Sequence, residues 1–537
     1  MIKPSNPRLW AGALLFALVV WGSFYNLANY PTIWWDEAIF SETAANLAQH
    51  HRYAFTVQSP NQLSDLDYRI SVGPAVILPV ALAYELWGVG VTQGRVVAGA
   101  YLVLAFLALF LAARRLWGSA AALGAVALAF LGTDVLYWGR SILGDIPALG
   151  LFLLSLWCLA RGLEAESLGS LLAGGIFLGL AFDAKEFYGL AFLPPLLLMA
   201  RLWWRDKTKL LKGFFALGLG LFLPLAGYLL LKTLILGSLV GAVQHFLAQK
   251  KLLCHEFFTP LTIGRIYPES LLYLLRHPLF WLGGLGAVWV WRSKNPSWGE
   301  KLWLWNFLIW SLMYLNAVWW QRFALPALFL ASPLAAQFLR VSARRLSASL
   351  ARPPWWLAPG IVAVFLILFY PIPGVDYLDQ IYTRKGDQPY RLVEFLQHHV
   401  PRSCLIETPE YELAFLTDDY RIHLMPAYYF IESTPDKIVL LNPRHKPYDF
   451  NRVGADLLIL GAFGKSVFRQ VYPPAAVAKK WRRVARVGFY DIYASRKMAK
   501  KLLKMLTSPV IPARLDASVK HKYIGLNAQP HHHTYYH

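Results

Sequence analysis

Eleven apolar runs, each long or nearly long enough to cross a bilayer, are the feature that most constrains how this chain can fold. With 537 residues, 57% hydrophobic and 15% charged, the chain is too apolar for an ordinary soluble protein and too long for a single anchor. We therefore expect a polytopic α-helical membrane protein with about 11 to 13 transmembrane helices. The runs are Leu9 to Ala28, Val96 to Ala113, Ser119 to Leu136, Ile146 to Ala160, Leu168 to Phe182, Phe187 to Trp204, Gly213 to Leu231, Leu279 to Trp291, Leu302 to Val318, Phe323 to Leu339 and Trp355 to Tyr370.

A twelfth apolar run, Val72 to Gly90, decides the topology, because its spanning would reverse the side of every later loop. Cytoplasmic loops are rich in Lys and Arg. If the N-terminus lies inside and this run stays at the outer interface, the basic clusters fall inside. We predict that arrangement, and the net charge of +21 then reflects topology and lipid contact, with no nucleic acid implied. The clusters are Arg114 and Arg115; Arg161; Arg201, Arg205, Lys207, Lys209 and Lys212; Arg292, Lys294 and Lys301; and Arg340, Arg344, Arg345 and Arg352.

The chain beyond Pro371 changes character, since short apolar strands alternate with amphipathic helices. We expect a transmembrane domain over 1–371, with outer loops 29–71 and 232–278, an extracytoplasmic α/β domain over 372–497, and a basic, mobile tail over 498–537. The predicted helices and strands are Tyr390 to Val400 and Glu410 to Leu416 as helices, and Ser403 to Thr408, Lys437 to Leu441, Ala455 to Leu460 and Arg486 to Ala494 as strands.

An acidic pair, Asp36 and Glu37, follows the first apolar run, where carboxylates are costly unless something needs them. In a helix, Asp36 shares a mostly apolar face with Phe40, Thr43 and Leu47 and would need a cationic or hydrogen-bonding partner. The alternative is that both acids complement the dipole of an interfacial helix. The pair alone leaves both interpretations open.

Four further charged residues are predicted on the same outer face: Asp145 with Arg140 in GRSILGDIP, Lys185 in FDAKE, and Arg322 in QRFALP. Each alone has an ordinary explanation, such as a helix cap for Asp145 or a snorkelling cation for Lys185. Two acids and three cations on one membrane face suit a reaction on an anionic lipid. We therefore treat the five, with Glu37, as candidate site residues.

The ordered set of motifs WDEAIFSETAANLAQHHRY, RVVAGAY, ARRLWG, GRSILGDIP, GLAFDAKE and QRFALP resembles the GT-C superfamily of membrane glycosyltransferases. Within it, the chain is most similar to the branch of protein O-mannosyltransferases and lipid A aminoarabinose transferases. The likeness runs from Met1 to about Leu339. The chain departs from that pattern at Phe323, where the family often has Tyr, and in VGPAVILP.

The resemblance implies inverting transfer of a sugar from a polyprenyl-phosphate donor to a lipid, glycan or protein acceptor. It implies an enzyme of the cytoplasmic (inner) membrane whose site faces the periplasm or extracellular side. Asp36 is the candidate general base, supported by Asp145, and Glu37 assists or binds a divalent cation. Arg140, Lys185 and Arg322 are candidates to bind the donor phosphate. No cofactor is required, because the donor is already an activated lipid; a divalent cation stays open.

Two other functions remain open at this point. A transporter or flippase of lipid-linked sugars would place ionisable residues near the midplane, often within an inverted repeat, and we find neither in the sequence. A surface polysaccharide ligase would share the lipid-linked substrate. Of the three cysteines, Cys254 and Cys404 could pair in an oxidising space, although their spacing predicts no disulfide framework.

Overall fold

Ten helices of the computed structural model fall on the predicted apolar runs. The structure describes residues 7–58, 62–257, 267–316, 320–349, 373–383, 386–425, 432–434, 437–439 and 448–507. The predicted span Trp355 to Tyr370 lies outside these residues. The ten helices are α1 (Pro7–Phe24), α4 (Val91–Trp117), α5 (Ser119–Gly132), α7 (Asp145–Ala165), α8 (Leu168–Ala184), α9 (Leu193–Trp203), α10 (Lys207–Leu236), α13 (Pro278–Trp291), α14 (Trp298–Asn316) and α15 (Leu325–Ser349).

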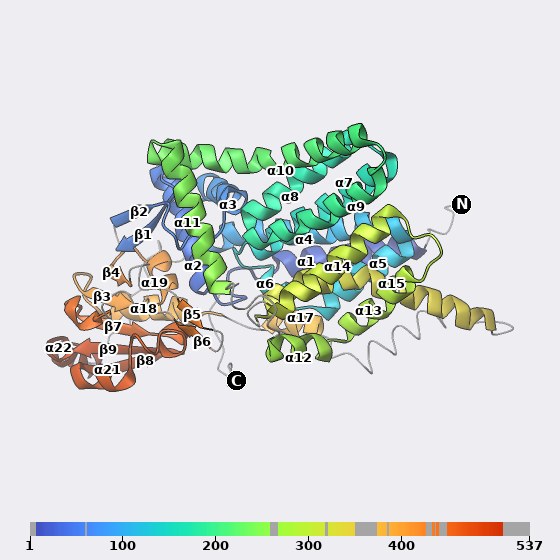
Figure 1. Cartoon of the computed structure of the whole chain (residues 1–537). Coiled ribbons are helices and arrows are strands. Elements are labelled where there is room, and N and C mark those ends of the chain that lie inside the picture. Colours follow the sequence, from blue (N-terminus) through green and yellow to red (C-terminus); the bar gives the residue numbers. More distant parts are fainter. Residues whose placement is uncertain are drawn as a thin grey trace.

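These helices form one bundle, in which α8 packs between α7 and α10, α7 packs on α4, and α13 packs on α15 (Figure 1). Within the described residues, four helical segments are long and apolar enough to cross a membrane alone. A fifth candidate is α12 (Pro268–Arg276) with α13, bent by 80° at the break between them. The bundle therefore agrees with the predicted class of membrane protein, while the number of crossings stays a prediction.

The outer surface of the bundle is apolar, as a lipid-facing surface must be. On α10, Leu211, Phe215 and Leu234 are each more than 60% exposed, although they are large hydrophobic side chains. A soluble protein rarely leaves such a contiguous apolar surface in water. Since lipid is the solvent in which this exposure costs nothing, the pattern supports membrane insertion of the bundle.

The run Val72 to Gly90 forms α3 (Pro74–Trp87), which begins at a proline and ends at Gly88 with φ of +83°. Its 14 residues correspond to about 21 Å, less than the ~30 Å of a hydrocarbon core. The helix packs on α4 and on α2 (Trp35–His50), the helix that carries the acidic pair (Figure 1). Because α5 and α13 have the same length and α3 packs on the predicted span α4 as well as on α2, the position of α3 at the outer interface stays a prediction.

A seven-stranded sheet, in the order β2-β1-β4-β3-β7-β9-β8, joins the outer loop 29–71 to the C-terminal part of the chain. The centre is parallel, because β3 pairs in parallel with both β4 and β7. The hairpin β1–β2 extends the sheet through one antiparallel register pair, Gln58 with His423. The strands are β1 (Ala54–Gln58), β2 (Gln62–Asp65), β3 (Leu405–Thr408), β4 (Arg421–Leu424), β7 (Leu457–Leu460), β8 (Trp481–Val487) and β9 (Tyr490–Ser495).

Three features of the C-terminal part differ from the prediction. The strand expected over Arg486 to Ala494 is a hairpin, because Gly488 adopts φ of +56° and turns β8 into β9. Strands β1, β2 and β4 were not predicted, since each is short and only partly apolar. The final helix α22 runs from Arg496 to Thr507, so the first part of the predicted tail is helical. The chain beyond it lies outside the described residues.

The remaining elements connect the bundle and the sheet or cover them. They are α6 (Val135–Trp138), η1 (Glu186–Phe192), α11 (Leu239–Phe257), η2 (Gln321–Ala324), α17 (Pro373–Thr383), α18 (Gln388–His399), α19 (Tyr411–Leu416), the hairpin β5 (Glu432–Thr434) and β6 (Lys437–Val439), η4 (Phe450–Arg452), α20 (Ala462–Lys465) and α21 (Pro474–Lys480).

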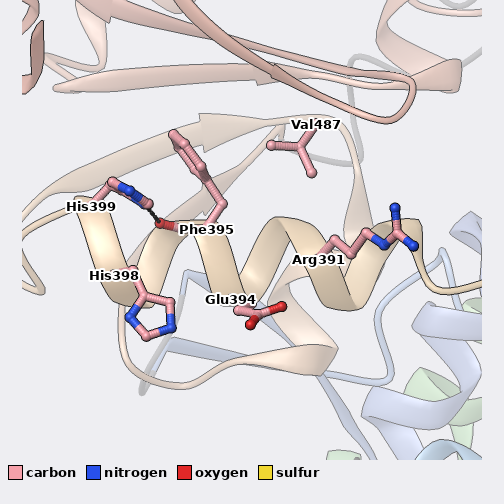
Figure 2. A pocket seen from close by; sticks show the side chains of 6 residues that line it. All are labelled: Arg391, Glu394, Phe395, His398, His399 and Val487. Carbon is pink, nitrogen blue, oxygen red and sulfur yellow. Dashed lines mark hydrogen bonds between the residues drawn. The ribbon is translucent and has the colours of Figure 1, made fainter. Parts of the chain in front are cut away.

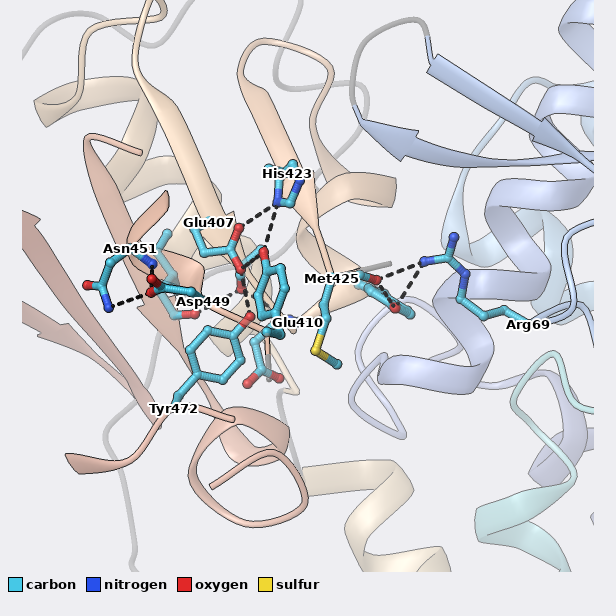
Figure 3. Close-up of polar contacts among 12 residues, drawn as sticks. Arg69, Glu407, Glu410, His423, Met425, Asp449, Asn451 and Tyr472 are labelled. Atoms are coloured by element: carbon cyan, nitrogen blue, oxygen red, sulfur yellow. Dashed lines mark hydrogen bonds and ion pairs between the residues drawn. The ribbon is translucent and has the colours of Figure 1, made fainter. Parts of the chain in front are cut away.

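Hydrogen bonds to a buried glutamate hold the centre of the sheet together. Glu407 on β3 is fully buried, and its carboxylate accepts hydrogen bonds from the hydroxyls of Tyr472 at 2.7 Å and Tyr448 at 2.8 Å (Figure 3). Its other oxygen lies 2.6 Å from Nδ1 of His423 on β4. Because the carboxylate is fully partnered, it stabilises the fold despite its burial.

Two more glutamates, Glu410 and Glu412, are buried where β3 leads into α19. Glu410 Oε1 accepts from the backbone N–H groups of Gly461 at 2.7 Å and Gly464 at 2.8 Å. The Tyr490 hydroxyl donates to Glu412 Oε1 at 2.8 Å. Burial raises the pKa of both carboxyls, and repulsion from Glu410 raises the pKa of Glu412 further.

This pair makes the stability of the protein depend on pH. Above the ordinary glutamate pKa of 4.5, the folded chain holds protons that the unfolded chain has lost, so the free energy of unfolding falls as pH rises. We expect the thermal unfolding midpoint to fall between about pH 5 and pH 9. The double variant Glu410→Gln, Glu412→Gln should flatten this slope, whereas Glu394→Gln, at an exposed position, should not. An unchanged slope in the double variant would contradict the account.

Candidate functional site

Asp36 lies in the first turn of α2 and forms an ion pair with Arg322. Nη1 of Arg322 lies 2.8 Å from Asp36 Oδ2. The Arg322 side chain is 2% exposed, whereas Asp36 is 19% exposed. Among the described residues, no group hydrogen bonds to Asp36 Oδ1. The buried cation thus holds one carboxylate oxygen, and the other stays open to a further partner.

Asp145, the first residue of α7, is the second carboxylate beside Arg322. Its Oδ2 lies 4.0 Å from Arg322 Nη1, and its side chain is 5% exposed. Both Asp145 Oδ2 and Arg322 Nε are buried without a hydrogen-bond partner in the described part of the chain. Such atoms are costly unless a ligand or water reaches them. The set formed by Asp36, Arg322 and Asp145, called the acid–arginine cluster below, can therefore take up another polar group.

Aromatic rings enclose the guanidinium of Arg322. Its Cζ lies 4.6 Å from the ring centroid of Trp320, 5.3 Å from those of Trp34 and Phe323, and 5.7 Å from that of Trp138. These rings come from three separate segments of the chain, because Trp320 and Phe323 both belong to η2 and its N-cap. They attract the cation through their faces and keep water away, so the charges of the acid–arginine cluster interact in a low-dielectric environment.

Lys185 is a second buried cation near this cluster. It caps the C-terminus of α8, is 4% exposed, and its Nζ lies 5.9 Å from the ring of Phe323, which Arg322 also contacts. Among the described residues, Lys185 Nζ has no ion pair or hydrogen bond; its contacts are the rings of Phe187 and Phe323. An ammonium buried without a counter-charge is costly. An anionic ligand would supply the missing charge.

The structure also explains how Asp145 and Lys185 come near each other. Gly144, which precedes Asp145, packs so closely on the end of α8 that an added Cβ would lie 2.2 Å from the carbonyl oxygen of Ala184. A side chain at this position would separate the two segments. The glycine therefore keeps the start of α7 against the residue before Lys185.

Two predicted site residues, Glu37 and Arg140, lie apart from the acid–arginine cluster. Glu37 and Arg95 are fully buried and form a bidentate pair, with Arg95 Nε 2.7 Å from Oε1 and Nη2 2.6 Å from Oε2. Glu37 Oε1 also accepts from the N–H of Ile142 at 3.2 Å. This pair ties α2 to the segment before Asp145, so Glu37 positions the cluster and is not part of it.

Arg140 is also fully buried, and its guanidinium donates to the backbone carbonyls of Gly22, Tyr25 and Tyr30. These carbonyls belong to the end of α1 and the turn that follows it. The contacts hold that turn and leave the guanidinium no free side for a phosphate. The structure thus does not bring Arg140 to the donor side of the cluster.

Residues that sequence reasoning missed are Arg95 and the rings Trp34, Trp138 and Trp320. Arg95 could have been noticed, because an arginine within an apolar helix needs a buried acid. The tryptophans looked like an ordinary aromatic belt. For metal binding, no described group of three or more His, Cys, Asp and Glu side chains is placed to hold an ion. Cys158 and Cys404 are buried.

A cavity of about 350 Å³ lies away from the acid–arginine cluster, between α18 and the end of β8 (Figure 2). It contains none of the predicted site residues. Glu394 and His398, which line it, are exposed, and His399 Nδ1 lies 3.0 Å from the Phe395 carbonyl. Because the charged groups here are solvated, we assign this cavity no reaction. It is lined by Arg391, Glu394, Phe395, His398, His399 and Val487.

Comparison with solved structures shows which class of fold this chain has. The structure of ArnT from Cupriavidus metallidurans bound to undecaprenyl phosphate is 15% identical, with a TM-score of 0.60, over 91% of this chain and 98% of that one. The oligosaccharyltransferase AglB from Archaeoglobus fulgidus, in complex with an inhibitory peptide and a dolichol-phosphate, is 14% identical, with a TM-score of 0.55. The match covers 92% of this chain and 74% of that one. The chain therefore has the GT-C fold of an integral membrane protein.

A family match then narrows this class. Residues 71–228, from the segment before α3 into α10, match the family described as dolichyl-phosphate-mannose-protein mannosyltransferase. The resemblance predicted from the ordered motifs is thus confirmed. Among curated protein sequences, none matches the chain.

The burial of the Glu37–Arg95 pair predicts a loss of folding when one charge is removed. Glu37→Gln leaves Arg95 buried without a counter-charge, which costs about 3–5 kcal/mol. We expect a lower yield of folded protein by size-exclusion chromatography, together with a lower activity per folded molecule, because the pair positions α2 and Ile142 beside the cluster. Replacing both residues by Met should recover part of the yield. A variant Glu37→Gln that folds normally but has lost activity would instead place Glu37 in the reaction.

Proposed function

We propose that the protein is an inverting glycosyltransferase that moves a sugar from a polyprenyl-phosphate donor to an acceptor on the extracytoplasmic face. The observation that carries this proposal is the acid–arginine cluster beside Lys185. It combines a reachable carboxylate, Asp36, with two buried cations that can take an anionic group. The family match over 71–228 and the GT-C fold agree with this class of reaction.

Asp36 is suited to be the general base in this reaction. Its side chain is partly exposed and Oδ1 has no hydrogen-bond partner among the described residues, while Arg322 fixes the orientation of the carboxylate through Oδ2. The acceptor hydroxyl gives its proton to Asp36, and the acceptor oxygen attacks the anomeric carbon opposite the phosphate. The bond between that carbon and the phosphate oxygen breaks, and the electron pair leaves with the polyprenyl phosphate. The configuration at the anomeric carbon is therefore inverted.

Arg322 and Lys185 are suited to stabilise the leaving phosphate. Charge accumulates on its oxygens as the bond breaks, and positioned cations in a low-dielectric site stabilise that charge most. Asp145 lies 4.0 Å from Arg322 Nη1 and holds the guanidinium between two carboxylates. Two of the structures similar to this chain contain undecaprenyl phosphate and dolichol-phosphate, which supports a lipid phosphate donor.

The proposed step uses only side chains of this chain and needs no nucleotide or cofactor. If a divalent cation takes part, Asp36 and Asp145 are the carboxylates that could bind it. We propose that the cluster lies at the outer end of the bundle. The packing of α2, which carries Asp36, on α19 supports this, since α19 belongs to the part of the chain predicted to be extracytoplasmic.

Replacing the base tests the proposal most simply. We expect Asp36→Asn to lower sugar transfer by about 10²- to 10⁴-fold, because the amide cannot accept the acceptor proton. The assay measures incorporation of labelled sugar from a lipid-linked donor in membranes that contain the native acceptor. Asp206→Asn is the matched control, since Asp206 caps α10 at an exposed position and Asn caps equally well. Near-normal transfer by Asp36→Asn would exclude Asp36 as the base.

Removing the second cation tests the donor site separately. Lys185→Met keeps the length of the side chain but loses one charge-assisted contact to phosphate, worth about 1.5–3 kcal/mol. We expect kcat/KM for the lipid-linked donor to fall about 10- to 100-fold, while KM for the acceptor stays unchanged. Because the variant removes an uncompensated buried charge, it should also be as stable as the wild type or more so. Unchanged kinetics for the donor would contradict the assignment of Lys185.

A further inference from the structure

The C-terminal part of the chain contacts the two residues that precede Asp36. Trp35 stacks on Tyr411 of α19, with ring centroids 4.9 Å apart and planes 14° apart. It also stacks on Phe463 of α20, at 5.6 Å and 16°. Both partner rings belong to the part of the chain that forms the sheet, and Trp35 is the first residue of α2. The position of Trp35 therefore depends on the α/β part of the fold.

The same Phe463 reaches the other side of the acid–arginine cluster. Its ring stacks on Trp34 at 6.0 Å and 24°, and the ring of Trp34 lies 5.3 Å from Cζ of Arg322. One phenylalanine thus packs on both tryptophans, of which one precedes Asp36 and the other covers Arg322. If it shifts, the ion pair between Asp36 and Arg322 loses support from both sides.

A short, tightly held turn presents Phe463. Glu410 Oε1 accepts from the N–H groups of Gly461, two residues before Phe463, and Gly464, the residue after it. A Cβ at Gly461 would lie 2.7 Å from the ring of Tyr490, so no larger residue fits without a shift. The buried carboxylate and the two glycines therefore fix where the ring points.

Tyr411, the other ring on Trp35, is also fixed from a second direction. The guanidinium of Arg69 donates to the Tyr411 hydroxyl and to the Met425 carbonyl, each at 3.2 Å (Figure 3). Arg69 is itself held by Asp67, at 2.8 Å from Nε. The segment after β2 is thereby locked to the end of β4, which leaves the sheet and α2 little freedom to move apart.

We propose that Phe463 is a positioning residue for sugar transfer, through which the α/β part of the chain holds Asp36 and Arg322 in their reactive arrangement. This inference rests on the proposed function and gives the C-terminal part of the chain a role in it. Phe463 contacts neither of the two carboxylates of the cluster, Asp36 and Asp145. It acts through Trp34 and Trp35. Small misplacements of reacting groups are costly, and a shift of about 1 Å can lower a rate 10²-fold.

The test compares Phe463→Ala with the conservative Phe463→Tyr. We expect Phe463→Ala to lower kcat by about 10- to 100-fold, with KM for the lipid-linked donor changed less than about twofold. Phe463→Tyr keeps the stacked ring and should restore most of kcat. The control is Phe395→Ala, which removes another ring from the C-terminal part of the chain. The Phe395 ring stacks on His399, with centroids 4.7 Å apart, and lies away from α2. It should leave kcat unchanged.

Rates are expressed per folded molecule, with the unfolding midpoint measured for each variant. A wild-type kcat in Phe463→Ala would overturn the positioning role. A loss of kcat that Phe395→Ala shares would also overturn it, because it points to general destabilisation. A loss of kcat that Phe463→Tyr fails to restore would do the same, because it points to a different function of the ring. A wild-type protein that transfers sugar from no lipid-linked donor would instead overturn the proposed function itself.

Discussion

The ion pair between Asp36 and Arg322 is the interaction on which the rest of the site depends. A guanidinium that is 2% exposed is costly to bury without a counter-charge, and two carboxylates from separate helices, Asp36 and Asp145, provide it. Because the arginine is so deeply enclosed by aromatic rings, its position is set by packing. That fixed position orients the carboxylate we assign as the base and leaves the nearby Lys185 to attract an anion.

The cluster is held in place by a second, fully buried pair, Glu37 with Arg95. Adjacent residues on α2 thus have different roles: Asp36 is partly open and suited to chemistry, whereas Glu37 faces inward and joins α2 to Ile142. The sheet contributes a third support through Phe463. The bundle, α2 and the sheet therefore converge on one carboxylate.

The sequence predicted the helices well because spanning requires long apolar runs, which are visible without partners. It also predicted one membrane face for Asp36, Asp145, Lys185 and Arg322, since the positive-inside rule assigns a side to each loop. It could not separate Glu37 and Arg140 from them. Their partners, Arg95 and backbone carbonyls of the turn after α1, are distant in sequence or carry no side-chain signal. Strands β1 and β2 were missed because they are stabilised by pairing with one another and with β4.

The most direct measurement of the central claim is a structure of the protein in complex with undecaprenyl phosphate. We predict that the phosphate lies within about 4 Å of both Lys185 Nζ and the Arg322 guanidinium. Asp36 should then face the space where the acceptor and the anomeric carbon meet. A phosphate bound elsewhere, with Lys185 still enclosed by the rings of Phe187 and Phe323 and the Asp36–Arg322 pair unchanged, would contradict the account.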